Sequence, residues 1–215
     1  MSTVTAAEVF SASPIIPVMV IEDTKDALPL AKALVAGGIN VFEITLRTEA
    51  ALESIRLISQ EIPEAITGAG TIINTQQFDA AVDAGAQFII SPGFSPALLA
   101  HCQKIPDIPY IPGVATASEM ITALDAGLDH LKFFPAEANG GALVLKAVSA
   151  ALPQIHFCPT GGVKKENLAN YLSLPCVGTI GGTWMIPASA IQAKSWEIIT
   201  GLSRQAVELA NSLRS

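Results

Sequence analysis

Short apolar runs alternate with longer amphipathic stretches along almost the whole chain. Each short run is rich in residues that favour strands, and a turn rich in Gly, Pro or Thr follows it. A run of strand length followed by a stretch of helix length can be counted eight times. The predicted strands are residues 15–21, 41–46, 65–71, 88–92, 110–114, 130–135, 156–160 and 177–184.

The amphipathic stretches carry ordinary helix boundary signals. Gly37-Gly38 and Gly85 follow two of them as stop signals, and Ser95 with the next proline begins another. Thr48 is expected to cap the helix after the second strand, without a capping box. The predicted helices are residues 5–11, 26–36, 48–61, 75–84, 95–102, 118–126, 141–151, 166–172 and 188–213, the last broken into two pieces.

This alternation predicts a single domain, residues 1–215, folded as a (β/α)₈ TIM barrel with an N-terminal helix. The alternative is a doubly wound open sheet, which normally carries a glycine-rich turn after its first strand. Here the first strand runs into Glu22-Asp23-Thr24-Lys25, which contains no glycine. The barrel is therefore preferred.

Composition narrows the functional class. Half of the residues are hydrophobic and only 14% are charged, so the chain can bury a large core. Its longest apolar runs are far shorter than the ~20 residues of a membrane helix, and residues 1–4 lack the features of a signal peptide. The net charge is −7 without any basic block, which argues against nucleic acid. A cytoplasmic protein that binds neither membrane nor nucleic acid is predicted.

The cysteines and histidines give no sign of a metal. Cys102, Cys158 and Cys176 have neither paired nor metal-ligand spacing, so they are predicted to be buried and reduced. The three histidines also lack ligand spacing and are interpreted as ordinary surface or strand-end residues. No metal and no cofactor are expected.

Two ionisable residues lie inside apolar strands. Glu43 stands within Val41-Phe42-Glu43-Ile44-Thr45, and Lys132 within Leu131-Lys132-Phe133. Buried charges are unfavourable unless they are paired or used. Burial lowers the pKa of a lysine in general, so its neutral amine can attack a carbonyl and form an iminium. An ion pair without chemistry remains the structural alternative.

The predicted strand ends carry further candidates. Barrel phosphate sites often form from the loops after strands 7 and 8, where Gly161-Gly162 and Gly181-Gly182 stand. Arg47 follows the second strand, and an arginine there can bind a substrate carboxylate through two hydrogen bonds. For Glu137 and Asn139, in the loop after the sixth strand, two interpretations are open, rim residues of the site or simple turn formers, and the second is preferred.

Several motifs in this order resemble one known family, the 2-keto-3-deoxy-6-phosphogluconate (KDPG) aldolases, many of which also cleave 4-hydroxy-2-oxoglutarate (KHG). The resemblance covers residues 14–210. The matching motifs are Phe42-Glu43-Ile44-Thr45-Leu46-Arg47-Thr48, Gly68-Ala69-Gly70-Thr71, Ser91-Pro92-Gly93, Lys132-Phe133-Phe134-Pro135-Ala136-Glu137 and Cys158-Pro159-Thr160-Gly161-Gly162.

The resemblance implies a homotrimeric class I aldolase without a metal, acting on a small keto acid. It implies that Lys132 forms the Schiff base and that Glu43 is the acid/base residue. This chain has Thr183 where family members usually have serine, so the hydroxyl is kept. The implied substrate-binding residues are Arg47 and Thr71 for the carboxylate, Pro92 and Phe134 for the pocket wall, Thr160 for substrate contact, and Gly161, Gly162 and Thr183 for the phosphate.

Two other functions remain open at this point. A sugar-phosphate isomerase or epimerase on the same barrel would use Glu43 as a base and Lys132 only as a stabilising charge. A non-catalytic sugar-phosphate sensor would bind its ligand without turnover. Borohydride trapping distinguishes the aldolase from the isomerase, because only the aldolase forms an imine.

Overall fold

The computed structural model describes residues 4–214, so the expectation that residues 1–4 lack a signal peptide falls largely outside the described residues. The predicted N-terminal helix is confirmed as α1. Strands and helices alternate through this range. The strands are β1 (Ile15–Met19), β2 (Val41–Thr45), β3 (Ile66–Gly70), β4 (Ile89–Ile90), β5 (Tyr110–Ile111), β6 (Gly113–Val114), β7 (His130–Phe133), β8 (His156–Pro159) and β9 (Ile180–Gly182).

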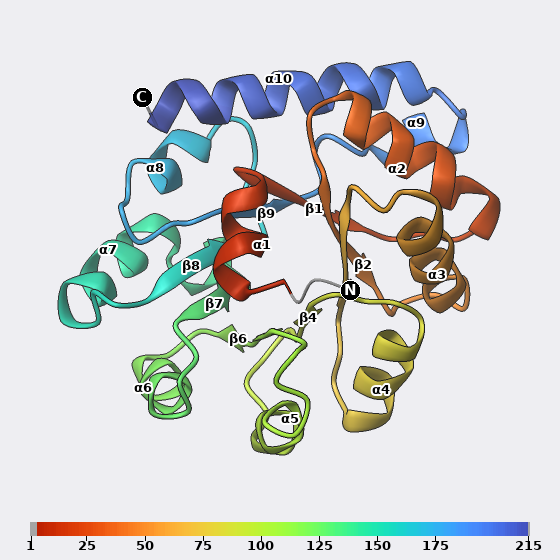
Figure 1. The fold of residues 1–215 in the computed structure, drawn as a ribbon. Coiled ribbons are helices and arrows are strands. Elements are labelled where there is room, and N and C mark those ends of the chain that lie inside the picture. Colours follow the sequence, from red (N-terminus) through yellow and green to blue (C-terminus); the bar gives the residue numbers. More distant parts are fainter. Residues whose placement is uncertain (1–3, 215) are drawn as a thin grey trace.

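The helices lie outside the strands in a ring, with α1 over its centre (Figure 1). Two short 3₁₀ helices, η1 and η2, precede α2 and α7. The bounds are α1 (Ala6–Ala12), η1 (Thr24–Asp26), α2 (Ala27–Ala36), α3 (Ala51–Glu61), α4 (Thr75–Asp83), α5 (Pro96–Cys102), α6 (Ala117–Asp125), η2 (Glu137–Asn139), α7 (Gly141–Ala151), α8 (Leu168–Leu172), α9 (Ala188–Gln192) and α10 (Trp196–Arg214).

The fold is of the α/β class, with parallel strands in a curled sheet. Six strands pair in the order β5-β4-β3-β2-β1-β9, and β6-β7-β8 form a second sheet. Isolated parallel bridges join Phe157 to Val177 and Thr160 to Gly181. Because the strands are parallel, their carboxyl ends meet at one edge.

Alternate residues of each strand serve two separate apolar clusters. Ile15 and Ile89 belong to the larger cluster, which the helices cover. Ile16 and Ile90, each one residue further on, belong to the smaller inner cluster. The inner cluster is enclosed by the concave face of the strands and comprises Val9, Phe10, Ile16, Val41, Phe88, Ile90, Ile111 and Cys158.

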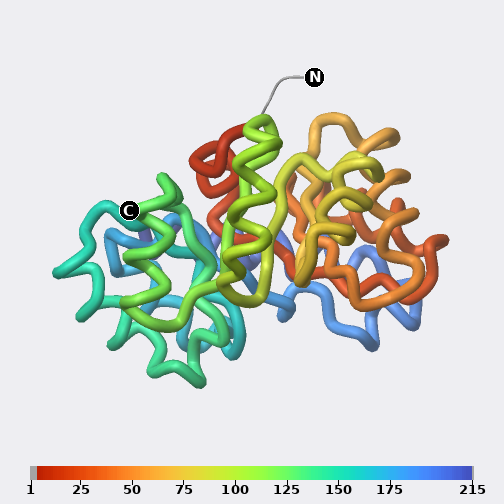
Figure 2. The backbone as a smooth tube through the Cα atoms, turned by 90° about the horizontal axis from the view of Figure 1, so that it is seen from below, coloured from red at the N-terminus to blue at the C-terminus, as the bar shows by residue number. Residues whose placement is uncertain are grey.

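The helix α1 covers the amino-terminal end of the strands. Val9 and Phe10 enter the inner cluster, and the Phe10 ring meets His130, the first residue of β7, edge to face at 4.9 Å. In Figure 2, turned by 90°, α1 lies at one edge of the molecule, which agrees with its place in Figure 1. The opposite end, where the strands finish, stays available for a site.

The predicted strand 110–114 is divided in the structure. Pro112 separates β5 from β6, since proline has no N–H for the ladder. Its carbonyl still accepts a hydrogen bond from the Lys132 amide at 2.9 Å, so the segment stays beside β7. The predicted strand 88–92 is also shorter, with only Ile89–Ile90 paired as a strand.

The predicted cap at Thr48 is wrong. The helix α3 begins at Ala51, and its N-cap Ala50 forms no side-chain hydrogen bond. The Thr48 hydroxyl instead donates to the Ile21 carbonyl at 2.6 Å and ties the end of β2 to the chain after β1. The predicted break in the last helix is confirmed, because α9 and α10 are separate and Lys194 between them has a φ of 53°.

Among residues 4–214, no helix combines the length and the apolar character that a membrane span requires. The three cysteines are buried and unpaired, as predicted. Burial raises the pKa of the Cys158 thiol to about 12, so this interior sulfur stays neutral.

Candidate active site

Lys132 and Glu43 meet on the concave face of the strands. The Lys132 Nζ donates to Glu43 Oε1 at 2.8 Å and to Oε2 at 3.2 Å. The two residues are 4% and 1% exposed, so the pair is almost completely shielded from solvent. The predicted juxtaposition of one amine and one acid is confirmed, although 89 residues separate them in sequence.

The strand register explains why these two side chains meet. In β7, Lys132 pairs with Gly113 of β6 and Cys158 of β8. In β2, Glu43 pairs with Val18 of β1 and Gly68 of β3. Cys158 belongs to the inner cluster, so Lys132 lies directly beside the apolar interior.

Gly70 provides the space for the Glu43 carboxylate. A Cβ added at Gly70 would lie 2.2 Å from Glu43 Oε1 and 2.6 Å from its Cγ. Real Cβ atoms do not approach so closely, so a larger residue would displace the carboxylate from Lys132. Gly70 is therefore a positioning residue. It is part of the motif Gly68-Ala69-Gly70-Thr71, but the sequence alone does not show why a glycine is needed at this position.

Gly70→Ala is expected to lower kcat by roughly 10²-fold, because a displacement of about 1 Å at a reacting group has an effect of this size. Gly201→Ala is the matched control, since a Cβ at Gly201 in α10 meets nothing within 4 Å. Steady-state kinetics of both variants test this. A wild-type kcat for Gly70→Ala would show that the carboxylate position does not matter.

Around this pair, the predicted binding residues lie at the same edge. Leu46 donates its amide to the Gly70 carbonyl at 2.9 Å, which brings the ends of β2 and β3 together. Arg47 and Thr71 directly follow these ends. The Arg47 side chain is exposed and forms no hydrogen bond or ion pair within residues 4–214.

Thr71 has an unusual backbone conformation. Its φ of 61° lies in the left-handed region, which β-branched residues rarely adopt. Such outliers gather at functional sites, where the surrounding structure holds them. This observation draws attention to Thr71 independently of any motif.

Phe134 contacts the ion pair, and Pro92 packs against Gly113, the residue that pairs with Lys132 in the sheet. The Lys132 ammonium lies 5.3 Å from the centre of the Phe134 ring, within the range of a cation–π contact. The peptide between Phe134 and Pro135 is cis. Pro92 is half-buried just after β4, and its carbonyl packs closely against Gly113, where a Cβ would lie 2.4 Å away.

Thr160 and the two glycine pairs gather at the ends of β8 and β9. Thr160 is buried, and its hydroxyl donates to the Cys158 carbonyl at 3.3 Å. Gly181 leaves room for that hydroxyl, since a Cβ there would lie 2.1 Å from it. Gly161 and Gly162 have φ values of 97° and 80°, which only glycine adopts readily. Thr183 is exposed at the end of β9.

The interpretation of Glu137 as a simple turn former is incomplete. Residues 137–139 do form the short helix η2, but the Glu137 carboxylate also accepts a hydrogen bond from the buried Tyr171 hydroxyl. This contact joins η2 to α8. Sequence spacing gives no signal for it, because 34 residues separate the two side chains.

No group of three His, Cys, Asp or Glu residues lies close enough to hold a metal ion within the described range. His101 and His130 instead pair with Asp79 and Asp129, both at 2.6 Å. Within residues 4–214, Lys132 and Glu43 form the only ion pair in which both side chains are less than 10% exposed.

The curled parallel α/β sheet carries a buried lysine–carboxylate pair at its carboxyl edge, an arrangement that suits a carbon–carbon lyase acting through a lysine amine. The family profile "Aldolase: KDPG and KHG aldolase" matches residues 6–202. The chain belongs to this family and is an aldolase. The family predicted from the sequence motifs is confirmed.

Named relatives agree with this assignment. The chain is 49% identical over 203 residues to the KHG/KDPG aldolase of Escherichia coli (strain K12), covering 94% of this chain and 95% of that one. It is 50% identical over 202 residues to the 2-dehydro-3-deoxy-phosphogluconate aldolase of Dickeya dadantii, covering 94% of both. These relatives give no support to an isomerase or epimerase.

Solved structures agree as well. The KDPG aldolase of Legionella pneumophila, crystallised with pyruvate captured as a covalent carbinolamine, superposes with a TM-score of 0.91. It is 50% identical, and the match covers 94% of this chain and 97% of that chain. The KDPG aldolase of Zymomonas mobilis ZM4 with 3-phosphoglycerate has a TM-score of 0.88 at 42% identity.

Proposed function

We propose that this protein cleaves 2-keto-3-deoxy-6-phosphogluconate to pyruvate and glyceraldehyde 3-phosphate, and 4-hydroxy-2-oxoglutarate to pyruvate and glyoxylate. The observation that carries the proposal is the buried contact between Lys132 and Glu43, at 2.8 Å and 3.2 Å. The names of the relatives supply the substrates.

The first half of the proposed reaction forms the iminium. A proton passes from Lys132 to Glu43 within their hydrogen bond, which leaves a neutral amine and a neutral acid. The amine attacks the C2 ketone and forms a carbinolamine. Glu43 then donates its proton to the departing hydroxyl, so that water leaves and a protonated iminium remains.

The second half breaks the carbon–carbon bond. The Glu43 carboxylate takes the proton of the C4 hydroxyl while the C3–C4 bond breaks, and its electron pair moves into the iminium. The aldehyde leaves and an enamine remains. Protonation at C3 and hydrolysis by water then release pyruvate and restore the amine.

The proposed binding roles are those that the family resemblance implies. Arg47 and Thr71 would bind the carboxylate next to the reacting ketone, and Pro92 and Phe134 would form the apolar wall. At the far end of the substrate, Thr160 would contact the hydroxylated carbons. Glycine-rich loops favour anions because their backbone amides approach closely. The phosphate would be bound by Gly161, Gly162 and Thr183.

The proposal also includes the closed barrel, the cellular compartment, the oligomeric state and the absence of a cofactor. The chain would be one domain whose sheets close into a (β/α)₈ barrel. Closure is supported by the short segment 110–114, which leads from β5 of the first sheet to β6 of the second, and by the two bridges between residues 157–160 and 177–181. It would act in the cytoplasm as a homotrimer without a cofactor, and exposed Leu143 and Ile73 suit a subunit interface.

A pyruvate assay coupled to lactate dehydrogenase tests the substrates. Turnover is expected with the phosphogluconate derivative and with 4-hydroxy-2-oxoglutarate, and the phosphogalactonate derivative gives a measure of selectivity at C4. Omission of substrate and addition of a chelator are the controls, and the chelator is expected to change nothing. Ligand binding without pyruvate release would instead favour a sensor.

A further inference from the structure

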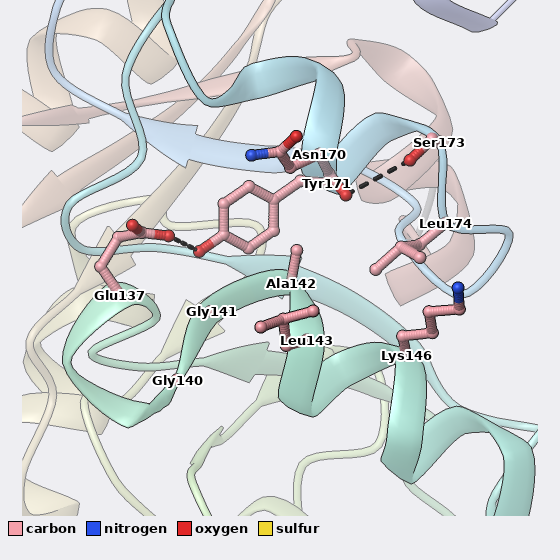
Figure 3. Close-up of a pocket in the computed structure, with 10 residues that line it drawn as sticks. All are labelled: Glu137, Gly140, Gly141, Ala142, Leu143, Lys146, Asn170, Tyr171, Ser173 and Leu174. Atoms are coloured by element: carbon pink, nitrogen blue, oxygen red, sulfur yellow. Dashed lines mark hydrogen bonds between the residues drawn. The ribbon is translucent and has the colours of Figure 1, made fainter.

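The contact between Tyr171 and Glu137 lies beside the proposed phosphate loop. In Figure 3, Tyr171 reaches from α8 across Gly141 to the Glu137 carboxylate. The two side chains line a cavity of about 590 Å³ between α7 and α8. The Tyr171 side chain is buried, although its partner lies on an exposed segment.

The backbone of η2 is attached directly to the loop that begins at Thr160. The Ala136 amide donates to the Thr160 carbonyl at 2.8 Å, and the Glu137 amide donates to the Gly161 carbonyl at 3.0 Å. A Cβ at Gly162 would lie 2.7 Å from both Cβ and Cγ of Glu137. The stem of Glu137 therefore packs on the Gly162 backbone.

A second tie comes from the start of α8. Asn167, its N-cap residue, donates from Nδ2 to the Gly162 carbonyl at 3.2 Å and accepts from the Lys164 amide at 2.7 Å. The carbonyls of Gly161 and Gly162 are thus both held by neighbours.

These ties fix the direction of the amides. In a planar trans peptide the N–H points opposite to the preceding C=O. The Gly161 carbonyl points toward η2, on the β7 side of β8, so the Gly162 amide points toward the β9 side. Thr183 follows β9 there, and the proposed phosphate site lies between the two.

The Tyr171 hydroxyl has one structural task in this arrangement, which is to hold Glu137. Burial, and then the hydrogen bond to Glu137, raises the pKa of Tyr171, so the hydroxyl keeps its proton and remains a donor. Gly141 makes room for the contact, since a Cβ there would lie 2.9 Å from Glu137 Oε1 and 3.0 Å from the Tyr171 oxygen.

We propose that the Tyr171–Glu137 hydrogen bond is a clamp that positions the Gly161–Gly162 loop for the distal phosphate of the substrate. Both residues are positioning residues, because neither touches the reacting atoms. The inference rests on the proposed function. It predicts selectivity: the clamp favours phosphorylated over unphosphorylated substrates of the same active site.

The test compares Tyr171→Phe with the wild-type protein on two substrates. This variant keeps the buried ring and loses only the hydroxyl. KM for the phosphogluconate derivative is expected to rise about 5- to 10-fold, the effect of one hydrogen bond, while its kcat and both constants for 4-hydroxy-2-oxoglutarate stay near wild type. Glu137→Gln, which keeps an acceptor oxygen, is expected to remain close to wild type, and Glu137→Ala to resemble Tyr171→Phe.

Tyr110→Phe is the matched control. Its hydroxyl also forms one buried hydrogen bond, to Ser91 Oγ at 2.8 Å, and within residues 4–214 neither Tyr110 nor Ser91 forms a hydrogen bond to residues 160–163. Its selectivity between the two substrates is expected to equal that of the wild type. Proportional losses on both substrates for Tyr171→Phe, or no loss on either, would overturn the clamp.

Two readouts do not depend on turnover. In Tyr171→Phe, the amides of residues 160–163 are expected to exchange hydrogen faster, and inorganic phosphate is expected to bind more weakly. Unchanged exchange and phosphate affinity would contradict the clamp. Absence of pyruvate release by the wild-type protein would contradict only the proposed function, so the two failures can be told apart.

Discussion

Replacing Lys132 with methionine is expected to lower kcat on every keto-acid substrate by about 10⁴-fold or more. Methionine fills a similar volume but has no amine, so no carbinolamine and no iminium can form. Without the iminium, the C3–C4 bond has no electron sink. The pyruvate-coupled assay measures this loss, and substrate can still occupy the pocket because the binding residues are unchanged.

The same substitution leaves Glu43 without its partner. A buried charge that loses its counter-charge destabilises a protein by about 3–5 kcal/mol. The double variant Lys132→Met/Glu43→Gln removes both charges and is expected to recover most of that stability in urea denaturation, while kcat stays at the level of the single variant. Recovery of activity together with stability would mean that Lys132 is only structural.

Glu43→Gln is expected to lower kcat by about 10²- to 10⁴-fold, the usual contribution of a general acid–base group. The amide oxygen of glutamine can still accept from Lys132 Nζ, which lies 2.8 Å from the carboxylate, so the pair keeps its geometry. Proton transfer to and from the substrate is lost. Covalent trapping of pyruvate should therefore persist, but more slowly.

A matched change at the surface controls for this experiment. Glu197→Gln alters an exposed glutamate in α10, far from the concave face of the strands, and is expected to keep wild-type kinetics. If Glu43→Gln also keeps kcat within about twofold, another group must transfer the protons, and the proposed role of Glu43 fails.

The hydrophobic pattern contains most of the fold, for a physical reason. Successive strand residues point to opposite faces of the sheet. Ile15 and Ile89 therefore belong to the outer cluster, and Ile16 and Ile90 to the inner cluster. The ends of the helices are harder to predict from the sequence. Thr48 has the residue type of a cap, yet its hydroxyl bonds to Ile21, because a partner across the sheet competes with the local one.

The part of the candidate site that can be predicted from the sequence is the pair of charged residues inside apolar strands. A charge inside an apolar strand stands out in the sequence, and two such charges of opposite sign, Lys132 and Glu43, are expected to pair. No comparable signal in the sequence indicates why position 70 needs a glycine, or that Tyr171 contacts Glu137. Both depend on distances between segments far apart in the chain, which only the packed structure contains.

Reductive trapping with pyruvate shows whether Lys132 forms the Schiff base. Wild-type protein is incubated with pyruvate and borohydride and digested with trypsin. Lys132 is the only lysine or arginine between Lys104 and Lys146, so its modification blocks cleavage and joins residues 105–146 into one peptide. We expect this peptide to carry one reduced pyruvyl group, in a reaction that requires pyruvate. Recovery of only the unmodified peptides 105–132 and 133–146, or adducts at other lysines alone, would contradict it.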